Sequence, residues 1–266
     1  MNEEKAPLVS VVMPSYNHAS FIGRAVESVL GQTCADLELI VIDNHSTDGT
    51  DGVLAAIQDP RLRVIKISNG GIIAASRNLG VKSASGRYIA FIDSDDIWLP
   101  EKLERQLEAL RAAPGAVLAY CRFRTLTGDE RSAEALPPLR VCTSGQIFNQ
   151  IYLKHFVACS GVLAEKRALD EAGGFSEEVG LVAIEDTDLW LRLSAKGGGV
   201  LSSEAPLFLY RVHPGNASGG AWRRFRRELA LSRRHYKRAG FFAFSASAAL
   251  SLISFFKQKA LQLLRR

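Results

Sequence analysis

Nearly continuous apolar runs alternate with segments of helical periodicity over the first half of the chain, and this alternation restricts the fold more than any other feature. The runs Leu8–Met13 and Leu37–Ile42 contain one polar residue each, which is typical of strands buried on both faces of a parallel sheet. Between them, apolar residues from Phe21 to Leu30 recur at helical spacing. The three segments together predict a strand–helix–strand unit.

The same alternation continues further along the chain. It predicts strands at Leu62–Ile67 and Tyr88–Ile92, and helices at Ile73–Ser83 and from about Pro100. We therefore expect an α/β fold with a mostly parallel central sheet. Ligands of such sheets bind beyond the carboxyl ends of the strands, and Asp43 and Asp93 each follow a strand there.

The alternation weakens after about Cys121, which indicates a boundary. Thr125–Val141 is rich in Pro, Gly and charge and predicts a loop. Later segments predict a helix, a strand, a helix closed by Gly197 and a strand, at Gln146–Lys154, Ala158–Leu163, Asp188–Lys196 and Leu207–Val212. We divide the chain into a domain over residues 1–218, with halves at about 8–121 and 122–218, and a tail over residues 219–266.

Composition excludes several classes of protein. Hydrophobic residues make up 47% and charged residues 23% of the 266 residues, as in a folded soluble protein. Met1–Pro7 lacks the basic and then apolar pattern of a secretory signal, so we expect a cytoplasmic protein. The four cysteines form no Cys-x-x-Cys pair, which argues against a zinc site or a disulfide framework; they are Cys34, Cys121, Cys142 and Cys159.

The tail is strongly basic. From Gly219 onward twelve Lys and Arg face the single Glu228, a local charge of +11; because the whole chain has a net charge of +5, the remainder carries −6. Basic residues are followed by the apolar segment Phe241–Phe256, whose sixteen residues are too few for a comfortable membrane span. Two interpretations remain open: a segment lying on an anionic membrane surface, or a helical hairpin packed on the body or on a second subunit.

Three carboxylates crowd the end of one predicted strand, at Asp93, Asp95 and Asp96 around Ser94. Mutual repulsion makes such crowding unfavourable without a cation, and hard oxygen ligands suit Mg²⁺ or Mn²⁺. A metal held there would share its coordination with a diphosphate. The alternative is an acidic turn that caps the helix near Pro100.

Polar residues also follow the first two strands. In the segment that starts at Pro14, Tyr16 offers a ring to stack on a base and Asn17 offers an amide to bond it. Asp43 and Asn44 are placed to hydrogen-bond a base or a ribose. Tight turns use the same residue types, so a purely structural role is the alternative.

Three acids precede Trp190 within a short helical segment: Glu185, Asp186 and Asp188. The dipole of a helix start stabilises negative charge, and capping explains one of the acids. Because it does not explain three, one of them is a candidate general base, and we include Glu185 and Trp190 among the site residues.

Two cationic residues complete the candidate set. Arg77, in the helix after Gly70-Gly71, could pair with a phosphate through two parallel hydrogen bonds, although a solvated helical arginine is the alternative. His213 follows a predicted strand and precedes a Pro-Gly turn, where it could ligate the metal or touch phosphate, or serve as an ordinary turn residue.

The order of these motifs resembles the family 2 glycosyltransferases of the GT-A fold, over roughly Val9 to His213. The matching segments are Pro14-Ser-Tyr-Asn17, Asp43-Asn-x-Ser-Thr-Asp-Gly-Thr50, Ala75-Ser-Arg-Asn78, Gly86-Arg-Tyr-Ile-Ala-Phe-Ile-Asp-Ser-Asp-Asp96, Gly173-Gly-Phe175, Glu185-Asp186 and Tyr210-Arg-x-His213. The resemblance implies a Rossmann-like three-layer sandwich with a nucleotide-binding first half, an acceptor-binding catalytic second half and a C-terminal helical extension. It also implies an inverting transferase of bacterial polysaccharide or glycolipid assembly.

The resemblance assigns roles to individual residues. Asp93 and Asp95 correspond to the family's Asp-x-Asp pair, with Asp95 as the direct metal ligand and Asp93 contacting ribose or metal. Asp96 orients the donor sugar or supports the turn. Asp186 corresponds to the base that deprotonates the acceptor hydroxyl during in-line attack at the anomeric carbon, and inversion follows from that single displacement.

The chain departs from the family pattern at Asn44, where many members carry a second aspartate that contacts uracil. An amide can still bond a pyrimidine, so we expect UDP as the first and dTDP as the second nucleotide of the donor. The Gln-x-x-Arg-Trp sequence of processive synthases is missing, which predicts transfer of a single sugar.

The expected partners are a nucleotide-sugar donor and a glycan or lipid-linked glycan acceptor. This places the enzyme in the cytoplasm, peripherally at the inner face of the membrane, and leaves a homodimer open. The alternative from another class is a nucleotide-sugar-binding scaffold that has lost transfer, which Asn44 favours and the three aspartates Asp93, Asp95 and Asp186 oppose. We expect no nucleic-acid partner, since no recognised binding motif accompanies the basic tail.

Overall fold

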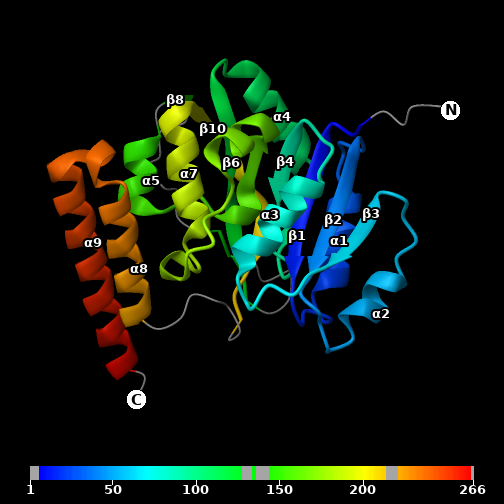
Figure 1. The fold of residues 1–266 in the computed structure, drawn as a ribbon, viewed down its shortest axis with the longest axis horizontal. Helices are drawn as coiled ribbons and strands as arrows, with labels where there is room; N and C mark the ends of the chain where they lie inside the picture. Colours follow the sequence, from blue (N-terminus) through cyan, green and yellow to red (C-terminus); the bar gives the residue numbers. More distant parts are fainter. Residues whose placement is uncertain (1–5, 128–133, 136–143, 146, 214–220, 265–266) are drawn as a thin grey trace.

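A central sheet with helices on both faces forms the body of the protein, and two C-terminal helices lie along one side of it (Figure 1). The structure, a computed structural model, describes residues 6–127, 134–135, 144–145, 147–213 and 221–264. The elements of the first half are β1 (Val9–Ser15), α1 (Ile22–Leu30), β2 (Leu37–Asp43), α2 (Thr50–Ala55), β3 (Leu62–Lys66), α3 (Ile73–Ser83), β4 (Tyr88–Phe91), β5 (Ile97–Trp98), α4 (Lys102–Ala112) and β6 (Ala116–Leu126).

The second half contributes shorter elements and the C-terminal hairpin. They are β7 (Glu134–Ala135), β8 (Ser144–Gly145), α5 (Phe148–Lys154), the 3₁₀ turn η2 (Cys159–Gly161), β9 (Val162–Glu165), α6 (Lys166–Ala172), the 3₁₀ turn η3 (Val179–Leu181), α7 (Glu185–Lys196), β10 (Gly198–Arg211), α8 (Ala221–Arg234) and α9 (Tyr236–Leu264).

The described strands form one sheet in the order β3-β2-β1-β4-β9-β6-β10-β5, with β7 and β8 on its margins. β1 pairs in parallel with β2 and β4, and β2 pairs in parallel with β3. β9 runs antiparallel between β4 and β6, and β10 runs parallel to β6. The α/β fold predicted from the alternating pattern is therefore confirmed, with a mixed sheet in which β1 to β4 are parallel and β5, β7, β8 and β9 pair antiparallel.

Alternate residues of β1 point to two separate cores, which makes the body three layers deep. Val12 packs in the core shared with α3, α5 and α7, whereas Val11 and Met13 pack in the core shared with α1 and α4. Because both faces of β1 and β2 are buried, these strands do not show the alternation of apolar and polar residues that is typical of a half-exposed strand. The expected three-layer sandwich is thus confirmed.

Two predicted helix starts were wrong by one turn or less. The helix expected from Pro100 begins at Lys102, with Pro100 just outside it. The helix expected from Asp188 begins at Glu185, so the first turn of α7 contains three acids. The early start is physically favourable because those carboxylates face the positive end of the helix dipole.

Two predicted strands were also placed incorrectly. The strand expected at Ala158–Leu163 is the turn η2 followed by β9. The strand expected at Leu207–Val212 is the end of β10, which begins at Gly198 because Gly199 allows a close approach: a Cβ there would lie 2.4 Å from Cδ1 of Ile147. The glycines that follow α7 therefore serve packing as well as helix termination.

The central strand β6 was not predicted. It passes through Cys121, where we expected a boundary, and it pairs with both β9 and β10, so one sheet continues across this point. Thr125 and Leu126 belong to β6, while most of the loop expected at Thr125–Val141 lies outside the described residues. Cys34, Cys121 and Cys159 are free thiols as predicted, and Cys142 lies outside the described residues.

A close backbone contact at Gly86 leads to a stability prediction. A Cβ at Gly86 would lie 2.6 Å from the backbone nitrogen of Ser10 in β1, whereas a Cβ at Gly52 in α2 would meet nothing within 4 Å. We expect Gly86→Ala to destabilise the protein by about 1–3 kcal/mol, because backbone must move. Gly52→Ala is the control and should be neutral or stabilising by about 0.5–1 kcal/mol. Thermal unfolding of both variants checks this, and equal melting temperatures would contradict it.

The tail forms the helical hairpin α8–α9, which confirms the expected helical extension. Gly240 (φ 82°, ψ 170°) interrupts α9 near its start. One side of the hairpin packs on the body: Leu231 is fully buried, and the Tyr152 hydroxyl of α5 donates to the Ser232 carbonyl oxygen at 2.8 Å. The interpretation as a hairpin packed on the body therefore holds for this side.

Candidate active site

The loops that follow β1 and β2 are joined to each other by side-chain hydrogen bonds. The Asn17 backbone N–H donates to Oγ of Ser46, and the Thr47 N–H donates to Oδ1 of Asn17. Asn17 and His45 both have positive φ, 53° and 50°, a conformation that costs energy and persists only where surrounding contacts enforce it. Pro14 is buried at the end of β1, and the exposed ring of Tyr16 borders these loops. The candidate base-binding residues are therefore held in one rigid unit.

Asp43 and Asn44 already have protein partners. The fully buried Asp43 carboxylate accepts hydrogen bonds from both the backbone N–H and the hydroxyl of Ser46. Oδ1 of Asn44 accepts from the Asn69 backbone N–H at 3.1 Å. Asp43 thus shapes the loop, and the amide nitrogen of Asn44 is the part of this pair that is left to contact a base.

The three aspartates after β4 have different surroundings. Oδ2 of Asp95 lies 2.9 Å from Nε2 of His213. Asp96 is buried, accepts a hydrogen bond from the Arg211 N–H and donates its own N–H to the Asp93 carbonyl oxygen, so it supports the turn. Ser94 is also buried, and its hydroxyl lies 2.7 Å from Nδ1 of His18.

The proton affinity of these acids reflects their crowding. Burial, together with the neighbouring Asp93 charge, raises the pKa of Asp95. Burial and the charges of Asp95 and Asp93 raise the pKa of Asp96 well above its ordinary value. A cation beside Asp95 would relieve this repulsion, because it favours the charged form of both acids.

Arg77 connects the two halves of the site. The guanidinium is buried; NH1 donates to Oε1 of Glu185 at 2.6 Å and NH2 donates to Oδ1 of Asp93 at 2.8 Å. Its Cζ also lies 5.5 Å from the centre of the Phe175 ring. Arg77 therefore pairs with two carboxylates that lie far apart in the sequence, and among the described residues its Nε has no hydrogen-bond partner.

Asp186 lies in the first turn of α7, next to Glu185. The Thr187 N–H donates to its Oδ1 at 2.7 Å. Burial, reinforced by the Glu185 charge, raises the pKa of Asp186 to about 7. Ala183, three residues before Asp186, has φ 65°, a backbone conformation that is uncommon for a residue with a Cβ. A carboxylate that titrates near neutrality suits a general base.

Trp190, which we included among the candidate site residues, lies in the core. It is fully buried, and its ring packs against Phe91 at 5.9 Å and Phe175 at 5.9 Å between centroids. Trp190 lies four residues after Asp186 in α7 and packs in the core between this helix and the sheet. Its contribution is to anchor α7.

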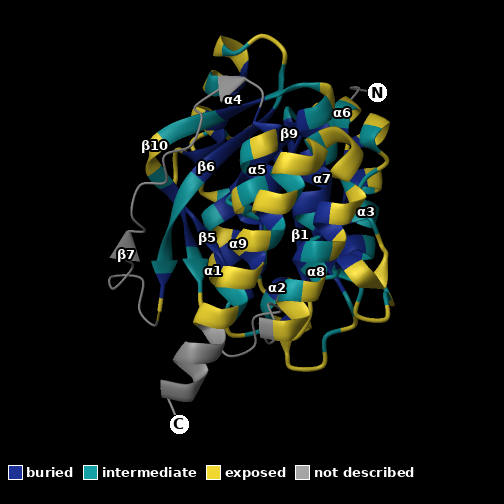
Figure 2. Cartoon of the chain, turned by 90° about the vertical axis from the view of Figure 1, so that its left-hand side faces the viewer, coloured by how far each residue is buried: buried dark blue, intermediate teal, exposed yellow. Residues whose placement is uncertain are grey.

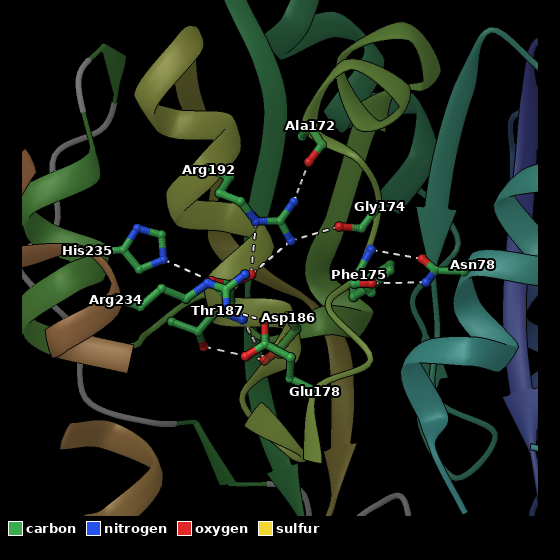
Figure 3. Close-up of polar contacts among 11 residues, drawn as sticks. Asn78, Ala172, Gly174, Phe175, Glu178, Asp186, Thr187, Arg192, Arg234 and His235 are labelled. Carbon is green, nitrogen blue, oxygen red and sulfur yellow. Dashed lines mark hydrogen bonds and ion pairs between the residues drawn. The ribbon is translucent and has the colours of Figure 1, made fainter. Parts of the chain in front are cut away.

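A second polar cluster, centred on Asp188, joins α7 to the C-terminal hairpin (Figure 3). Asp188 is fully buried and accepts from Arg192 at 2.9 Å, from Arg234 at 3.0 Å and from His235 at 2.9 Å. Arg192 also donates to the carbonyl oxygens of Ala172 and Gly174. The helix that carries Asp186 is therefore fastened on two sides by charge-assisted hydrogen bonds.

Sequence reasoning missed several residues that the fold brings to the site. His18 contacts Ser94 although it showed no ligand spacing, and the Arg211 side chain donates to the Asp95 carbonyl oxygen. The Ser160 hydroxyl accepts from the Asp93 N–H. Arg211 was recognisable from its place beside His213 in the final motif, whereas nothing local to His18 or Ser160 indicates these contacts.

Comparison with known proteins bears on this geometry. The family model described as Glycosyl transferase family 2 matches residues 10–173. The Escherichia coli protein WfaP, named as a UDP-Glc:alpha-D-GlcNAc-diphosphoundecaprenol beta-1,3-glucosyltransferase, is 32% identical over 83% of this chain and 84% of its own. TuaG of Bacillus subtilis (strain 168), whose name places it in teichuronic acid biosynthesis as a glycosyltransferase, is 31% identical over 82% and 84% of the two chains.

Solved structures agree with the fold. The S. aureus protein TarS superposes with a TM-score of 0.71 at 18% identity, over 94% of this chain and 72% of that chain. The mannosyltransferase PcManGT from Pyrobaculum calidifontis, solved with GDP-Man and Mn²⁺, gives a TM-score of 0.70 at 19% identity over 98% and 76%. These likenesses confirm the GT-A fold. The family match over most of the motifs, with relatives above 30% identity along most of both chains, shows that the protein is a glycosyltransferase of family 2.

Proposed function

We propose that this protein transfers a single sugar from a nucleotide diphosphate, with metal and with inversion, to an acceptor hydroxyl. The observation that carries the proposal is the Arg77 bridge. It joins Asp93, at the end of β4 where donor and metal are expected, to Glu185, beside the candidate base Asp186. A displacement needs the donor and the base on opposite sides of the reacting carbon. The Arg77 bridge fixes the positions of Asp93 and Glu185 relative to each other, and therefore those of the donor and base regions.

The metal fits the residues beside Asp95. Within the described part of the chain no three His, Cys, Asp or Glu side chains form a ready cluster, but Oδ2 of Asp95 and Nε2 of His213 lie 2.9 Å apart. Asp95 and His213 would hold the ion, with Asp93 nearby, and the donor diphosphate and water would complete its coordination. Mg²⁺ takes oxygen ligands almost exclusively, so the imidazole favours Mn²⁺ of the two. When bound, the ion would neutralise the departing diphosphate.

The nucleotide would lie against the loops after β1 and β2. Tyr16 is exposed there and offers its ring for stacking on a base. Uracil and thymine both present carbonyl oxygens to the amide nitrogen of Asn44, whose Oδ1 is already engaged. This contact fits either pyrimidine, and we place UDP first because the names of WfaP and the related protein WfgD specify UDP-Glc, with dTDP second.

Asp186 would act as the base. Its carboxylate takes the proton of the acceptor hydroxyl while that oxygen attacks the anomeric carbon, and the bond from that carbon to the phosphate oxygen breaks. The electron pair of that bond leaves with the nucleoside diphosphate. One displacement on the opposite face inverts the configuration.

The acceptor proposal is a glycan or lipid-linked glycan of cell-surface polysaccharide assembly, handled at the cytoplasmic face of the membrane. It is supported by the names of WfaP and of WfgD, another Escherichia coli protein that is 30% identical over 83% of both chains; both names specify a diphosphoundecaprenol acceptor. The alternative, a binding scaffold without transfer, is favoured only by Asn44.

Donor binding measured by calorimetry across UDP, dTDP and GDP sugars tests the metal site. We expect Asp95→Ala to weaken Mn²⁺-dependent binding at least by the ~10–100-fold that loss of an outer-sphere partner costs a metal site. The exposed Asp170→Ala on α6 is the control and should bind as wild type. Equal affinity of both variants would exclude Asp95 as a ligand. If the wild-type protein binds a donor but neither transfers its sugar to any acceptor nor hydrolyses the donor, the binding-scaffold alternative would be favoured.

A further inference from the structure

Helix α9 exposes several large apolar side chains, although two of its serines are buried. Phe242, Ile253 and Phe256 are 88%, 63% and 62% exposed, whereas Ser247 and Ser251 are buried. Figure 2 shows exposed residues along α9. A surface helix of a soluble protein has the opposite arrangement. Burying serines while exposing large apolar side chains is favourable only if the outer side meets an apolar medium or a partner.

The exposed side chains form one continuous stripe. Phe242, Ala249, Ile253 and Phe256 are spaced by seven, four and three residues, which places them on one face of a helix. The opposite face packs on α8, where the Ser247 and Ser232 hydroxyls lie 2.8 Å apart. The apolar stripe is therefore held facing away from the body.

The neighbouring helix α8 supplies unpaired positive charge. Arg223, Arg226 and Arg233 are exposed, as is Lys237 at the start of α9, and none of them has a carboxylate partner in the part of the chain that the structure describes. By contrast, Arg234 is paired with Glu178 and Asp188. Exposed cations beside an exposed apolar stripe are the pattern of a helix pair at an anionic bilayer surface.

We infer that the α8–α9 hairpin is a membrane-binding surface, with the α9 stripe inserted at the boundary of headgroups and acyl chains and the α8 arginines on anionic headgroups. A second copy of the chain fits this surface less well, because pairing two hairpins would bring together two segments of charge +11. The inference concerns attachment and does not depend on the proposed sugar transfer.

The helix lies on the membrane and does not cross it. By length and composition Tyr236–Lys257 could span a bilayer: it has 22 residues, a mean hydropathy of 1.8 and only 11% of its apolar window buried. However, its inner face is packed on α8 and α5, so insertion across the bilayer would carry the α8 arginines into hydrocarbon. The contacts of Asp188 with Arg234 and His235 also fasten the hairpin to α7. The membrane-binding surface therefore keeps a constant orientation relative to the candidate base Asp186 on the same helix.

Flotation of the full-length protein with vesicles of phosphatidylcholine alone or with phosphatidylglycerol tests this surface. We expect binding to the anionic vesicles only, and loss of binding in the triple variant Phe242→Ser, Ile253→Ser, Phe256→Ser. Val179→Ser, which removes an exposed apolar residue of η3, should bind as wild type. Arg226→Gln with Arg233→Gln should weaken partitioning by roughly fivefold per arginine, which corresponds to ~1 kcal/mol per basic residue.

A matched charge control is Arg87→Gln with Arg167→Gln, two exposed arginines on the body. It removes the same net charge and should leave vesicle binding unchanged. All substituted side chains are exposed, so circular dichroism should report intact folding for every variant. The inference is overturned if wild type ignores anionic vesicles, if the two charge variants lose binding equally, or if the apolar triple variant floats like wild type. Dimerisation in light scattering that the triple variant abolishes, without vesicle binding, would assign the stripe to a second copy.

Discussion

Asp186→Asn should lower turnover by about 10²–10⁴-fold, the usual contribution of a general base, while donor affinity stays at the wild-type value. The reason is that asparagine keeps the size and the hydrogen bond of Asp186 to Thr187 but cannot accept the acceptor's proton. Steady-state kinetics of sugar transfer, combined with calorimetry of donor binding, measure the two quantities separately.

The pH profile gives an independent readout of the same residue. Because burial and Glu185 raise the pKa of Asp186 to about 7, wild-type kcat/KM should rise with pH through about 7, where the carboxyl loses its proton. This rise of kcat/KM with pH should be missing in Asp186→Asn. Asp170 is an exposed aspartate of α6, and the control Asp170→Asn should keep both the wild-type rate and the rise with pH. A variant that retains wild-type turnover would remove Asp186 from the mechanism.

The second large effect is expected at Asp188, where substitution should cost stability. Asp188→Asn should lower the free energy of unfolding by about 3–5 kcal/mol, because it removes the buried carboxylate that Arg192 and Arg234 share as counter-charge. Glu178→Gln is the matched control: the Glu178 side chain, the other partner of Arg234, is 63% exposed, so its loss should cost only about 0–1 kcal/mol. Urea unfolding of the full chain measures both.

The sign of the pH dependence follows from the same contacts. Burial by itself would raise the pKa of Asp188, but the hydrogen bond from His235 and the charges of Arg192 and Arg234 lower it below the ordinary value. A lowered carboxyl pKa contributes stability that is present above the unfolded-state pKa of about 3.9 and lost as the pH falls further. The stability difference between wild type and Asp188→Asn should therefore shrink below about pH 4. A difference that is independent of pH would show that packing, not charge, dominates.

The Asp188→Asn variant also allows the effect on stability to be distinguished from the effect on turnover. If Asp188→Asn folds at low temperature, its hairpin contacts are weakened while Asp186 is intact. Comparing its turnover with that of Asp186→Asn at that temperature tells whether α7 keeps its position without the full cluster.

The layered α/β fold and most strand-end residues could be predicted because they depend on local patterns. β1 and β2 are buried on both faces, so their apolar runs are visible without knowledge of their neighbours. The aspartates after β4 stand at a strand end, where α/β sheets place their ligands. β6 escaped prediction because charged residues such as Arg122 and Arg124 interrupt its pattern on a strand that is only partly buried.

By itself the sequence determined the family, the strand–helix order up to β4 and the acids that are candidates for the site, since each depends on residues close together in the chain. Only the tertiary structure decided their partners: Arg77 with Glu185, His213 with Asp95 and His18 with Ser94 meet across separations of 108, 118 and 76 residues. It also decided that Trp190 is core and that α9 faces outward with its apolar side. Long-range packing determines which side of a helix is covered, and no local pattern records what covers it.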